Sequence, residues 1–227
     1  MITSISQPTL FPWIGYFDII KQSDIFVFLD NVKFEKRSWQ MRNRLKIILE
    51  NEEKDTWIRI PTMANKSDTE IKNILIDNSQ NWKKKHQTTF KTNYGKKFEN
   101  IKFINQIYDK DWWKISDFNI EFIKKCCDFL RIKTKILKAS EMNVNGKKSY
   151  LLLDICKKTS ASKYLSTVGS KEYLQKDKKI FENEKIEILY HNFIHPNYKQ
   201  KGSQFIENLS ILDLIFNEEE NSYKFFK

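Results

Sequence analysis

Short apolar runs separated by polar turns dominate the first third of the chain. A strand-like run at residues 2–6 precedes a helical pattern at 13–22, where Pro12 can occupy the first turn because its missing N–H is not needed there. Four further runs rich in β-branched and aromatic residues predict strands at 24–30, 44–50, 56–61 and 70–76. The charged turn at 51–55 joins two of them, so residues 44–61 are expected to form a hairpin.

From Ser79 onward the apolar positions recur at helical spacing. The first helix is expected to begin at the N-cap Ser79 and to end at Gly95. Its apolar stripe comprises Trp82, His86, Phe90 and Tyr94. A second amphipathic helix is predicted over 112–130. Residues 79–130 are therefore expected to form a helical subdomain inserted within a larger domain.

Strands alternate with helices through the second half of the chain. The strands are predicted at 134–139, 162–167 and 186–193, and the helices at 149–159 and 203–216. The last helix is expected to turn Phe205, Leu209, Leu212 and Phe216 inward. This alternation predicts an α/β fold, with a mixed, mostly parallel sheet covered by helices and a helical insertion, as a single domain over residues 1–227.

The composition is that of a folded protein. With 227 residues, 40% hydrophobic and 14% aromatic, the chain can build a substantial core, which excludes wholesale disorder. No apolar run approaches the roughly 20 residues of a membrane helix, and the first residues lack the pattern of a secretory signal. We therefore expect a cytoplasmic protein without membrane insertion.

The cysteines and histidines do not form a metal-binding pattern. Cys126 and Cys127 are adjacent and Cys156 stands alone, so no disulfide framework is expected. The chain has three histidines and contains no CxxC, P-loop, GxGxxG, HExxH or GxSxG motif. Neither a metal nor a cofactor is expected.

Arginine is rare in this basic chain, and its placement is uneven. The net charge is +11, yet only five of the 40 basic residues are arginines. Abundant lysine is typical of a solvated surface, although it also fits a nucleic-acid partner. Three arginines, Arg37, Arg42 and Arg44, lie within the stretch KRSWQMRNR. Because a guanidinium binds phosphate or carboxylate through two bonds at once, this cluster indicates anion recognition, with ordinary surface ion pairs as the alternative.

Polar residues follow several predicted strands, at the edge where open α/β sheets bind ligands. Residues 166–169 follow one strand, and Asp30 ends another, where it can orient a hydroxyl, an amine or a cation, or form a turn. His195 is predicted to be a general acid or base held by Pro196, or else a structural histidine at a strand end. Tyr198 and Gln200 alternate with His195, whereas His86 and His191 are expected to be structural.

The opening loop contains several of the prolines and glycines of a chain that has only four prolines and five glycines. Pro8 and Pro12 stiffen the connection between the first strand and helix. Gly15 permits the close approach of a ligand or another backbone, and Trp13 and Tyr16 can supply a stacking wall. The alternative is a rigid, core-packed connection with no ligand.

Four segments of the chain resemble the WbqC-like protein family: SQPTLFPWIGYFD (6–18), SDIFVFLDNVKFEKRSWQMRNRLK (23–46), KYLSTVGSKEYL (163–174) and HPNYKQ followed by LSILDLIFN (195–217). The resemblance implies a role in bacterial surface-polysaccharide biosynthesis, typically of O-antigen or capsule, without supplying a reaction. It carries over Gln7, Pro8, Pro12, Trp13, Gly15, Tyr16, Asp30, Lys36, Arg37, Trp39, Arg42, Asn43, Arg44, Tyr164, Gly169, Tyr173, His195, Pro196, Tyr198 and Gln200.

The leading hypothesis is a transferase that acylates or aminoacylates the amine of a nucleotide-linked amino sugar. The three clustered arginines would hold the diphosphate or an anionic donor, and Trp13 or Trp39 would stack on a base or sugar. Asp30 would orient a hydroxyl or amine, and His195 would take the proton of the attacking amine. The remaining predicted substrate-binding residues are Gln7, Tyr16, Lys36, Asn43, Tyr198 and Gln200.

The rival hypothesis is a nucleic-acid-binding protein. Basic residues are interleaved with aromatic ones over 33–46 and 82–98, a composition that can follow a phosphate backbone and stack on bases. The two hypotheses combine if the donor is an aminoacyl-tRNA held by the lysine-rich surface.

Overall fold

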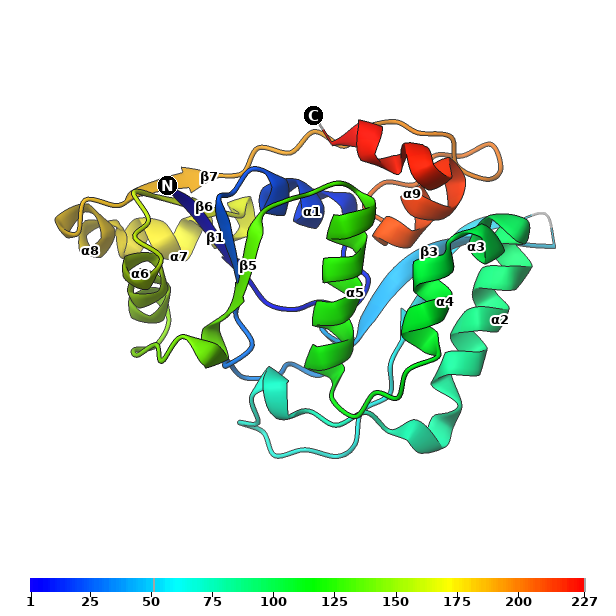
Figure 1. Ribbon diagram of the computed structural model, residues 1–227, viewed down its shortest axis with the longest axis horizontal. Helices are drawn as coiled ribbons and strands as arrows, with labels where there is room; N and C mark the ends of the chain where they lie inside the picture. Colours follow the sequence, from blue (N-terminus) through cyan, green and yellow to red (C-terminus); the bar gives the residue numbers. More distant parts are fainter. Residues whose placement is uncertain (51, 227) are drawn as a thin grey trace.

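The computed structural model describes residues 1–50 and 52–226, in which a parallel five-stranded sheet organises the fold (Figure 1). The strand order is β5-β2-β1-β6-β7, and every neighbouring pair is parallel. The predicted α/β fold is confirmed, but the main sheet is parallel throughout rather than mixed. Its strands are β1 Ile2–Ser6, β2 Ile25–Phe28, β5 Lys135–Lys138, β6 Lys163–Ser166 and β7 Glu187–Tyr190.

The strands carry apolar side chains on both faces, so helices must cover both. In β2, Phe26 and Phe28 pack into one buried cluster, while Ile25 and Val27 pack into another. Figure 1 shows α5 and α6 on opposite sides of the sheet. The first cluster includes α1 Ile14–Lys21 and α5 Ile115–Phe129, and the second includes α6 Ser149–Lys158, α7 Lys171–Lys176 and α8 Lys178–Asn183.

The strand order reverses direction at the centre of the sheet. From β1 the chain proceeds outward to β2 and then β5, whereas β6 returns to the other side of β1 and is followed outward by β7. The carboxyl ends of β1 and β6 therefore lie next to each other at a topological switch point. In open α/β sheets this is the place where a crevice for ligands forms.

A separate antiparallel hairpin consists of β3 Arg42–Leu49 and β4 Glu52–Arg59. The hairpin was predicted, but the turn at 51–55 was not placed correctly. Residues 52–55 belong to β4 because Leu49 pairs directly with Glu52, and Asn51 lies outside the described residues. The strand predicted at 70–76 is wrong: its buried Ile71 and Ile74 are three positions apart, and a short 3₁₀ turn with isolated bridges takes its place.

Four helices fill the region where two were predicted: α2 Trp82–Tyr94, α3 Lys96–Asn100, α4 Lys102–Tyr108 and α5. Gly95 ends α2 with a φ of 55°, as expected. The N-cap of α2 is Asn81 rather than Ser79, whose backbone N–H is accepted by Asp77. Residues of α2 to α5 pack into the same buried cluster as α1 and β2.

The last helix is much shorter than predicted. α9 Ile211–Glu218 begins only after Ser210, whose hydroxyl accepts the backbone N–H of Leu212. Residues 203–210 are irregular, and Phe205 is partly exposed rather than turned inward. Short 3₁₀ turns complete the structure at Ile71–Asn73, Asn78–Gln80, Ala139–Glu141, Val168–Ser170 and Glu219–Phe225.

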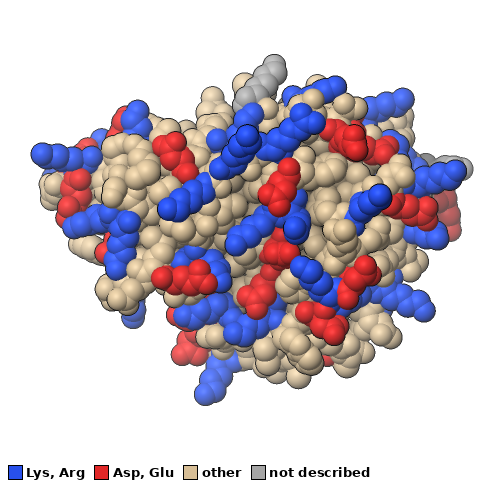
Figure 2. Space-filling model, in the orientation of Figure 1, with Lys and Arg blue, Asp and Glu red and all other residues tan. Residues whose placement is uncertain are grey.

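Charges of both signs share the surface. On the face drawn in Figure 2, the Lys and Arg side chains are interspersed with Asp and Glu side chains instead of gathering into one basic area. Several lysines are paired, as in Lys110–Glu121 at 3.0 Å and Lys157–Glu184 at 2.7 Å. Over the described part of the chain, no helix combines the length and the apolar character required to cross a membrane.

Candidate functional site

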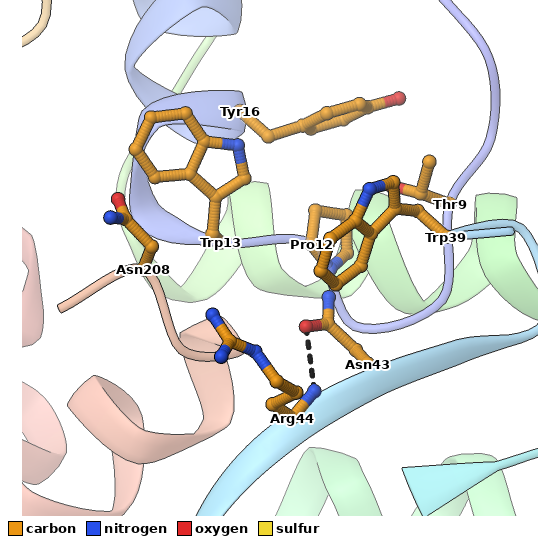
Figure 3. A pocket seen from close by; sticks show the side chains of 8 residues that line it. All are labelled: Thr9, Pro12, Trp13, Tyr16, Trp39, Asn43, Arg44 and Asn208. Carbon is orange, nitrogen blue, oxygen red and sulfur yellow. Dashed lines mark hydrogen bonds between the residues drawn. The ribbon is translucent and has the colours of Figure 1, made fainter. Parts of the chain in front are cut away.

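One cavity gathers five of the residues predicted to bind substrate. We call it the arginine cavity; its volume is about 290 Å³, and Figure 3 shows its side chains. The five predicted residues come from three segments: the opening loop with α1, the loop before β3, and β3 itself. The lining residues are Thr9, Pro12, Trp13, Tyr16, Trp39, Asn43, Arg44 and Asn208.

Backbone hydrogen bonds hold these distant segments side by side. The N–H of Leu10 donates to the carbonyl of Trp39 at 2.8 Å. The N–H of Ser210 donates to the carbonyl of Arg44 at 2.9 Å, and Ser210 also forms an antiparallel bridge with Trp13. These bonds join the hairpin, the opening loop and the segment before α9, and the three segments together enclose the cavity.

Asn43 fixes the opening loop from the side of β3. Its buried amide nitrogen donates to the carbonyls of Leu10 and Phe11, at 3.0 and 2.8 Å. Phe11 has a φ of 44°, an uncommon value for a bulky residue, and its ring is fully buried. The Asn43 side chain thus stabilises an unfavourable loop conformation that presents Pro12 and Trp13 to the cavity.

Arg44 brings a cationic fork to the floor of the arginine cavity. Its Nη1 donates to Asp55 at 2.8 Å, and the side chain remains 32% exposed. Its Nε is buried and has no hydrogen-bond partner among the residues that the structure describes. In Figure 3 the guanidinium reaches from β3 toward Asn208 and Trp13. Within the described chain, the Arg44 side chain bonds only to Asp55, so the exposed part of the guanidinium can donate further hydrogen bonds to an anion in the cavity.

The other members of the arginine cluster point elsewhere. The guanidinium of Arg42 stacks on Trp57, 4.1 Å from the ring centroid. Trp57 lies 5.6 Å from Trp39, and these two indoles are 47% and 49% exposed. Arg37 and Lys36 are exposed on the preceding loop and do not belong to the cavity lining. The predicted cluster is thus one cavity arginine, one stacking arginine and one exposed loop arginine.

A second cavity, also of about 290 Å³, lies where the strand order reverses, and we call it the switch-point cavity. Residues at or just beyond the carboxyl ends of β1, β6 and β7 contribute to it, as the sheet topology requires. It shares Trp13 and Tyr16 with the arginine cavity. Its lining residues are Ser6, Trp13, Gly15, Tyr16, Ile19, Thr167, Val168, Gly169, His191, Asn192 and Phe193.

Gly15 makes room for the indole of Trp13. A Cβ atom at position 15 would overlap three carbon atoms of this ring. The indole also meets Phe193 edge-on, with the ring centroids 5.1 Å apart. The sequence predicted a close approach at Gly15, and the approaching group is a side chain of the loop itself.

His191, which the sequence analysis interpreted as structural, lines the switch-point cavity. It directly follows β7, its backbone N–H donates to the carbonyl of Ser166 at 2.8 Å, and its buried ring lines the switch-point cavity. Its Nε2 bonds to Asp18 of α1 at 2.6 Å. The strand was predicted to run to residue 193 but ends at Tyr190, and the end of the apolar alternation at Tyr190 was the signal available in the sequence.

His195, by contrast, does not lie just past a strand end, where the strand predicted at 186–193 would have placed it. It lies five residues beyond β7, in an irregular segment, and its Nδ1 is 2.9 Å from the carbonyl oxygen of Pro196. Its ring packs between Tyr198 and Phe205 and does not belong to the lining of either cavity. Its assignment as a proton acceptor has no support from position.

Tyr198 and Gln200 anchor the same irregular segment to the core. The hydroxyl of Tyr198 donates to Asp213 of α9 at 2.8 Å, and Asp213 also accepts from Tyr94 at 2.8 Å. Gln200 is buried and donates to the carbonyl of Ile206 at 2.8 Å. Burial raises the pKa of the Asp213 carboxyl. These contacts are structural and leave neither side chain in the two cavities.

Asp30 and Gln7 lie at the carboxyl edge of the sheet but outside both cavities. The Asp30 carboxylate is buried and accepts the backbone N–H and the hydroxyl of Ser140, at 2.9 and 2.6 Å. The Gln7 side chain accepts from Gln40 at 2.8 Å. Gln7 and Asp30 therefore line neither of the two cavities that Trp13 lines.

The other candidate nucleophiles and ligands are buried. His86 donates from Nε2 to the carbonyl of Arg59 and bonds to Tyr108 through Nδ1, and burial lowers the pKa of His86 to about 4. The three cysteines are free, and burial raises the pKa of both Cys127 and Cys156 to about 12. Within residues 1–50 and 52–226, no group of three His, Cys, Asp or Glu side chains is arranged to hold a metal ion.

Comparisons with known proteins identify the family of the chain. An uncharacterized protein of Mycobacterium tuberculosis strain H37Rv, Rv1507c, is 28% identical over 220 residues, which cover 94% of this chain and 92% of that protein. No solved structure matches. The family model described as the WbqC-like protein family matches residues 7–225, which include both cavities apart from Ser6. The chain belongs to the WbqC-like protein family.

Proposed function

We propose that the protein is a transferase of bacterial surface-polysaccharide biosynthesis that acylates or aminoacylates the amine of a nucleotide-linked amino sugar. The observation that carries the proposal is the arginine cavity, where an arginine with free donors faces two tryptophans and a tyrosine. This combination suits a ligand that has both a flat ring and a phosphate group.

The size of the two cavities supports a ligand of two parts. Each has about 290 Å³, which is at the lower limit of the roughly 300–1,000 Å³ typical of ligand pockets. They adjoin along Trp13 and Tyr16. A nucleotide in the arginine cavity and its sugar in the switch-point cavity would use both.

Trp39 and Arg44 would have different roles in the arginine cavity, one in stacking and the other in binding phosphate. Trp39 is half-exposed and is backed by Trp57, which is itself covered by Arg42, so the Trp39 ring is supported for contact with a base. Arg44 would bind the phosphates, because Asp55 occupies only part of its donor fork.

Binding of nucleotide sugars tests the proposal directly. The protein is heated with UDP-linked and dTDP-linked sugars that carry a free amine, and the melting temperature is measured. Ligand at about 100 times its Kd stabilises the native state by about 2.7 kcal/mol, a rise of roughly 5–10 °C for a chain of this size. Trp39→Ala should abolish this rise, whereas Trp113→Ala, which removes a 72% exposed tryptophan outside both cavities, should not.

No shift with any nucleotide or nucleotide sugar would reject the proposal. A shift that survives in Trp39→Ala would place the ligand elsewhere on the protein.

A donor carried on RNA is a second candidate, favoured by a separate basic cavity of about 560 Å³. Four of its lining residues are lysines: Lys96, Lys97, Lys199 and Lys201. Contacts to several phosphates would make RNA affinity fall steeply with salt concentration. RNA binding that is absent at low salt would remove this candidate without affecting the nucleotide sugar.

A further inference from the structure

We propose that His191, oriented by Asp18, is the proton acceptor for the attacking amine, and that the switch-point cavity holds the amine-bearing end of the sugar. The inference rests on the proposed function and adds the site of the chemistry to it.

The contact with Asp18 fixes which ring nitrogen of His191 can act. An ionised carboxylate only accepts hydrogen bonds, so Nε2 carries the hydrogen and donates it to Asp18 at 2.6 Å. In the neutral ring, Nδ1 then carries the lone pair. Within the described chain, Nδ1 has no hydrogen-bond partner. Asp18 is thus a positioning residue that leaves one basic nitrogen free.

The pair is built as a rigid unit. The backbone of His191 is bonded to Ser166 at the end of β6, and its ring stacks on Phe193 at 5.8 Å. Asp18 also accepts from Gln22 at 2.5 Å, one turn further along α1. The neighbouring strand and the helix after β1 therefore hold both partners, as proton transfer between fixed groups requires.

The surroundings of His191 suit a polar substrate. Ser6, Thr167 and Asn192, which carry hydroxyl and amide groups, line the same cavity as Tyr16 and Trp13. Such groups can bond to sugar hydroxyls, while the aromatic rings cover an apolar sugar face. The location is the crevice where open α/β sheets place reacting groups.

The other histidines are excluded by their contacts. His86 uses both ring nitrogens, on Arg59 and Tyr108, in the buried core. His195 has Nδ1 against the carbonyl of Pro196 and does not line the switch-point cavity.

The proposed step is an acyl transfer from an ester or thioester donor. The amine nitrogen of the sugar attacks the carbonyl carbon, a C–N bond forms, and the C–O or C–S bond of the donor breaks. Nδ1 of His191 takes one N–H proton from the attacking nitrogen, and the Asp18 carboxylate stabilises the resulting imidazolium. The imidazolium then gives this proton to the departing oxygen or sulfur. The products are an amide and a free alcohol or thiol, and nothing is oxidised or reduced.

Two measurements on His191 test the inference without an identified substrate. Long-range ¹H–¹⁵N NMR of the wild-type protein at neutral pH should show His191 with hydrogen on Nε2 and an unprotonated Nδ1. Diethyl pyrocarbonate, an acylating reagent, should modify His191 in a His195→Asn background and leave His86 unmodified. Asp18→Asn should lose the single tautomer of His191, since an amide can either donate or accept.

Specific results would overturn the inference. Hydrogen on Nδ1 of the wild-type protein, or a His191 as unreactive as His86, would show that the pair only ties β7 to α1. If nucleotide sugars bind but His191 is inert, the inference alone fails. If His191 behaves as expected but no nucleotide sugar binds, the proposed function fails and the basic histidine stands.

Discussion

The two cavities are equal in volume and share two aromatic residues, yet they are built from different parts of the fold. The arginine cavity depends on the hairpin and on the segment before α9, which are additions to the parallel sheet. The switch-point cavity depends on the strand ends that any doubly wound sheet brings together. The first offers a cation and flat rings, and the second offers a carboxylate–imidazole pair. Under the proposed function, recognition would belong to the additions and proton transfer to the sheet.

The largest expected effect is on turnover, from a change in the switch-point cavity. His191→Asn should lower kcat by about a hundred- to ten-thousand-fold, because a positioned general base contributes that much to rate. Nucleotide affinity should hardly change, since the arginine cavity is untouched. The measurement is a steady-state assay of amide formation with the nucleotide sugar that the thermal-shift screen selects.

His195→Asn is the matched control for this experiment, because it makes the same substitution outside both cavities. Equal losses in the two variants would contradict the division between them. A loss confined to His195→Asn would restore the original assignment from sequence.

A smaller effect is expected on affinity, from a change in the arginine cavity. Arg44→Lys keeps the charge but removes the fork, and hydrogen bonds to charged groups contribute about 1.5–3 kcal/mol. The Kd for the nucleotide should therefore rise roughly ten- to a hundredfold in titration calorimetry. Arg131→Lys, at an arginine that stacks on Tyr223, should leave the Kd unchanged. An unaltered Kd in Arg44→Lys would move the phosphate site away from β3.

The contact between Gly15 and Trp13, which lies where the two cavities adjoin, offers a third test. Gly15→Ala would push the indole of Trp13 out of place, and overpacking of this kind costs about 1–3 kcal/mol of stability. Both turnover and nucleotide affinity should fall together, because Trp13 lines both cavities. Trp113→Ala is the control, because Trp113 is exposed and lies outside both cavities. Thermal unfolding and the two functional measurements on both variants decide the outcome.

The smallest expected effect is a difference between the two cavities in their sensitivity to acid. The pKa of Glu53 on β4 is lowered from 4.5 to about 2, first by its bond to Lys46 and then by the backbone N–H groups of Ser203 and Gln204. Because the folded-state pKa is the lower one, ionised Glu53 stabilises the fold above about pH 4.5, and this stabilisation is lost as the pH falls toward 2.

This carboxylate joins the hairpin to the segment that carries Asn208, so acid should loosen the arginine cavity before the switch-point cavity. Fluorescence of Trp39 and NMR signals of Thr167, followed from pH 6 to pH 3, measure the two regions. Glu53→Gln should already be loosened at pH 6 and should lose this part of the acid sensitivity. Simultaneous changes in both regions would contradict the comparison.

The local patterns in the sequence were sufficient to predict the five strands of the main sheet, the hairpin, the α/β class and the aromatic residues of the opening loop, but they also predicted a strand at 70–76 where the structure has a 3₁₀ turn. They could not predict where the chain order reverses, because that depends on which strand lies beside β1. A strand end misplaced by three residues was enough to favour His195 over His191. Proximity in the sequence also suggested one arginine cluster. In the structure, Arg42 stacks on Trp57 and Arg44 pairs with Asp55, so the two side chains do not act together.

The role of Asp30 was also beyond prediction from the sequence, because it depends on a contact with a distant residue. Its position after an apolar strand is that of a ligand-binding acid, and the sequence gives no sign of its partner. That partner, Ser140, is 110 residues away and follows β5, two strands from β1. Each oxygen of this buried carboxylate already accepts a hydrogen bond from Ser140, which reduces its capacity to bind a ligand.

The contact between Trp13 and Gly15 has a consequence for how such chains can change over generations. With the indole lying on the α-carbon of position 15, any larger residue there is obstructed by Trp13. Once Trp13 is replaced by a small residue, this obstruction is removed. The effects of the two substitutions are then not additive, and the order in which they occur determines which path passes through a folded protein.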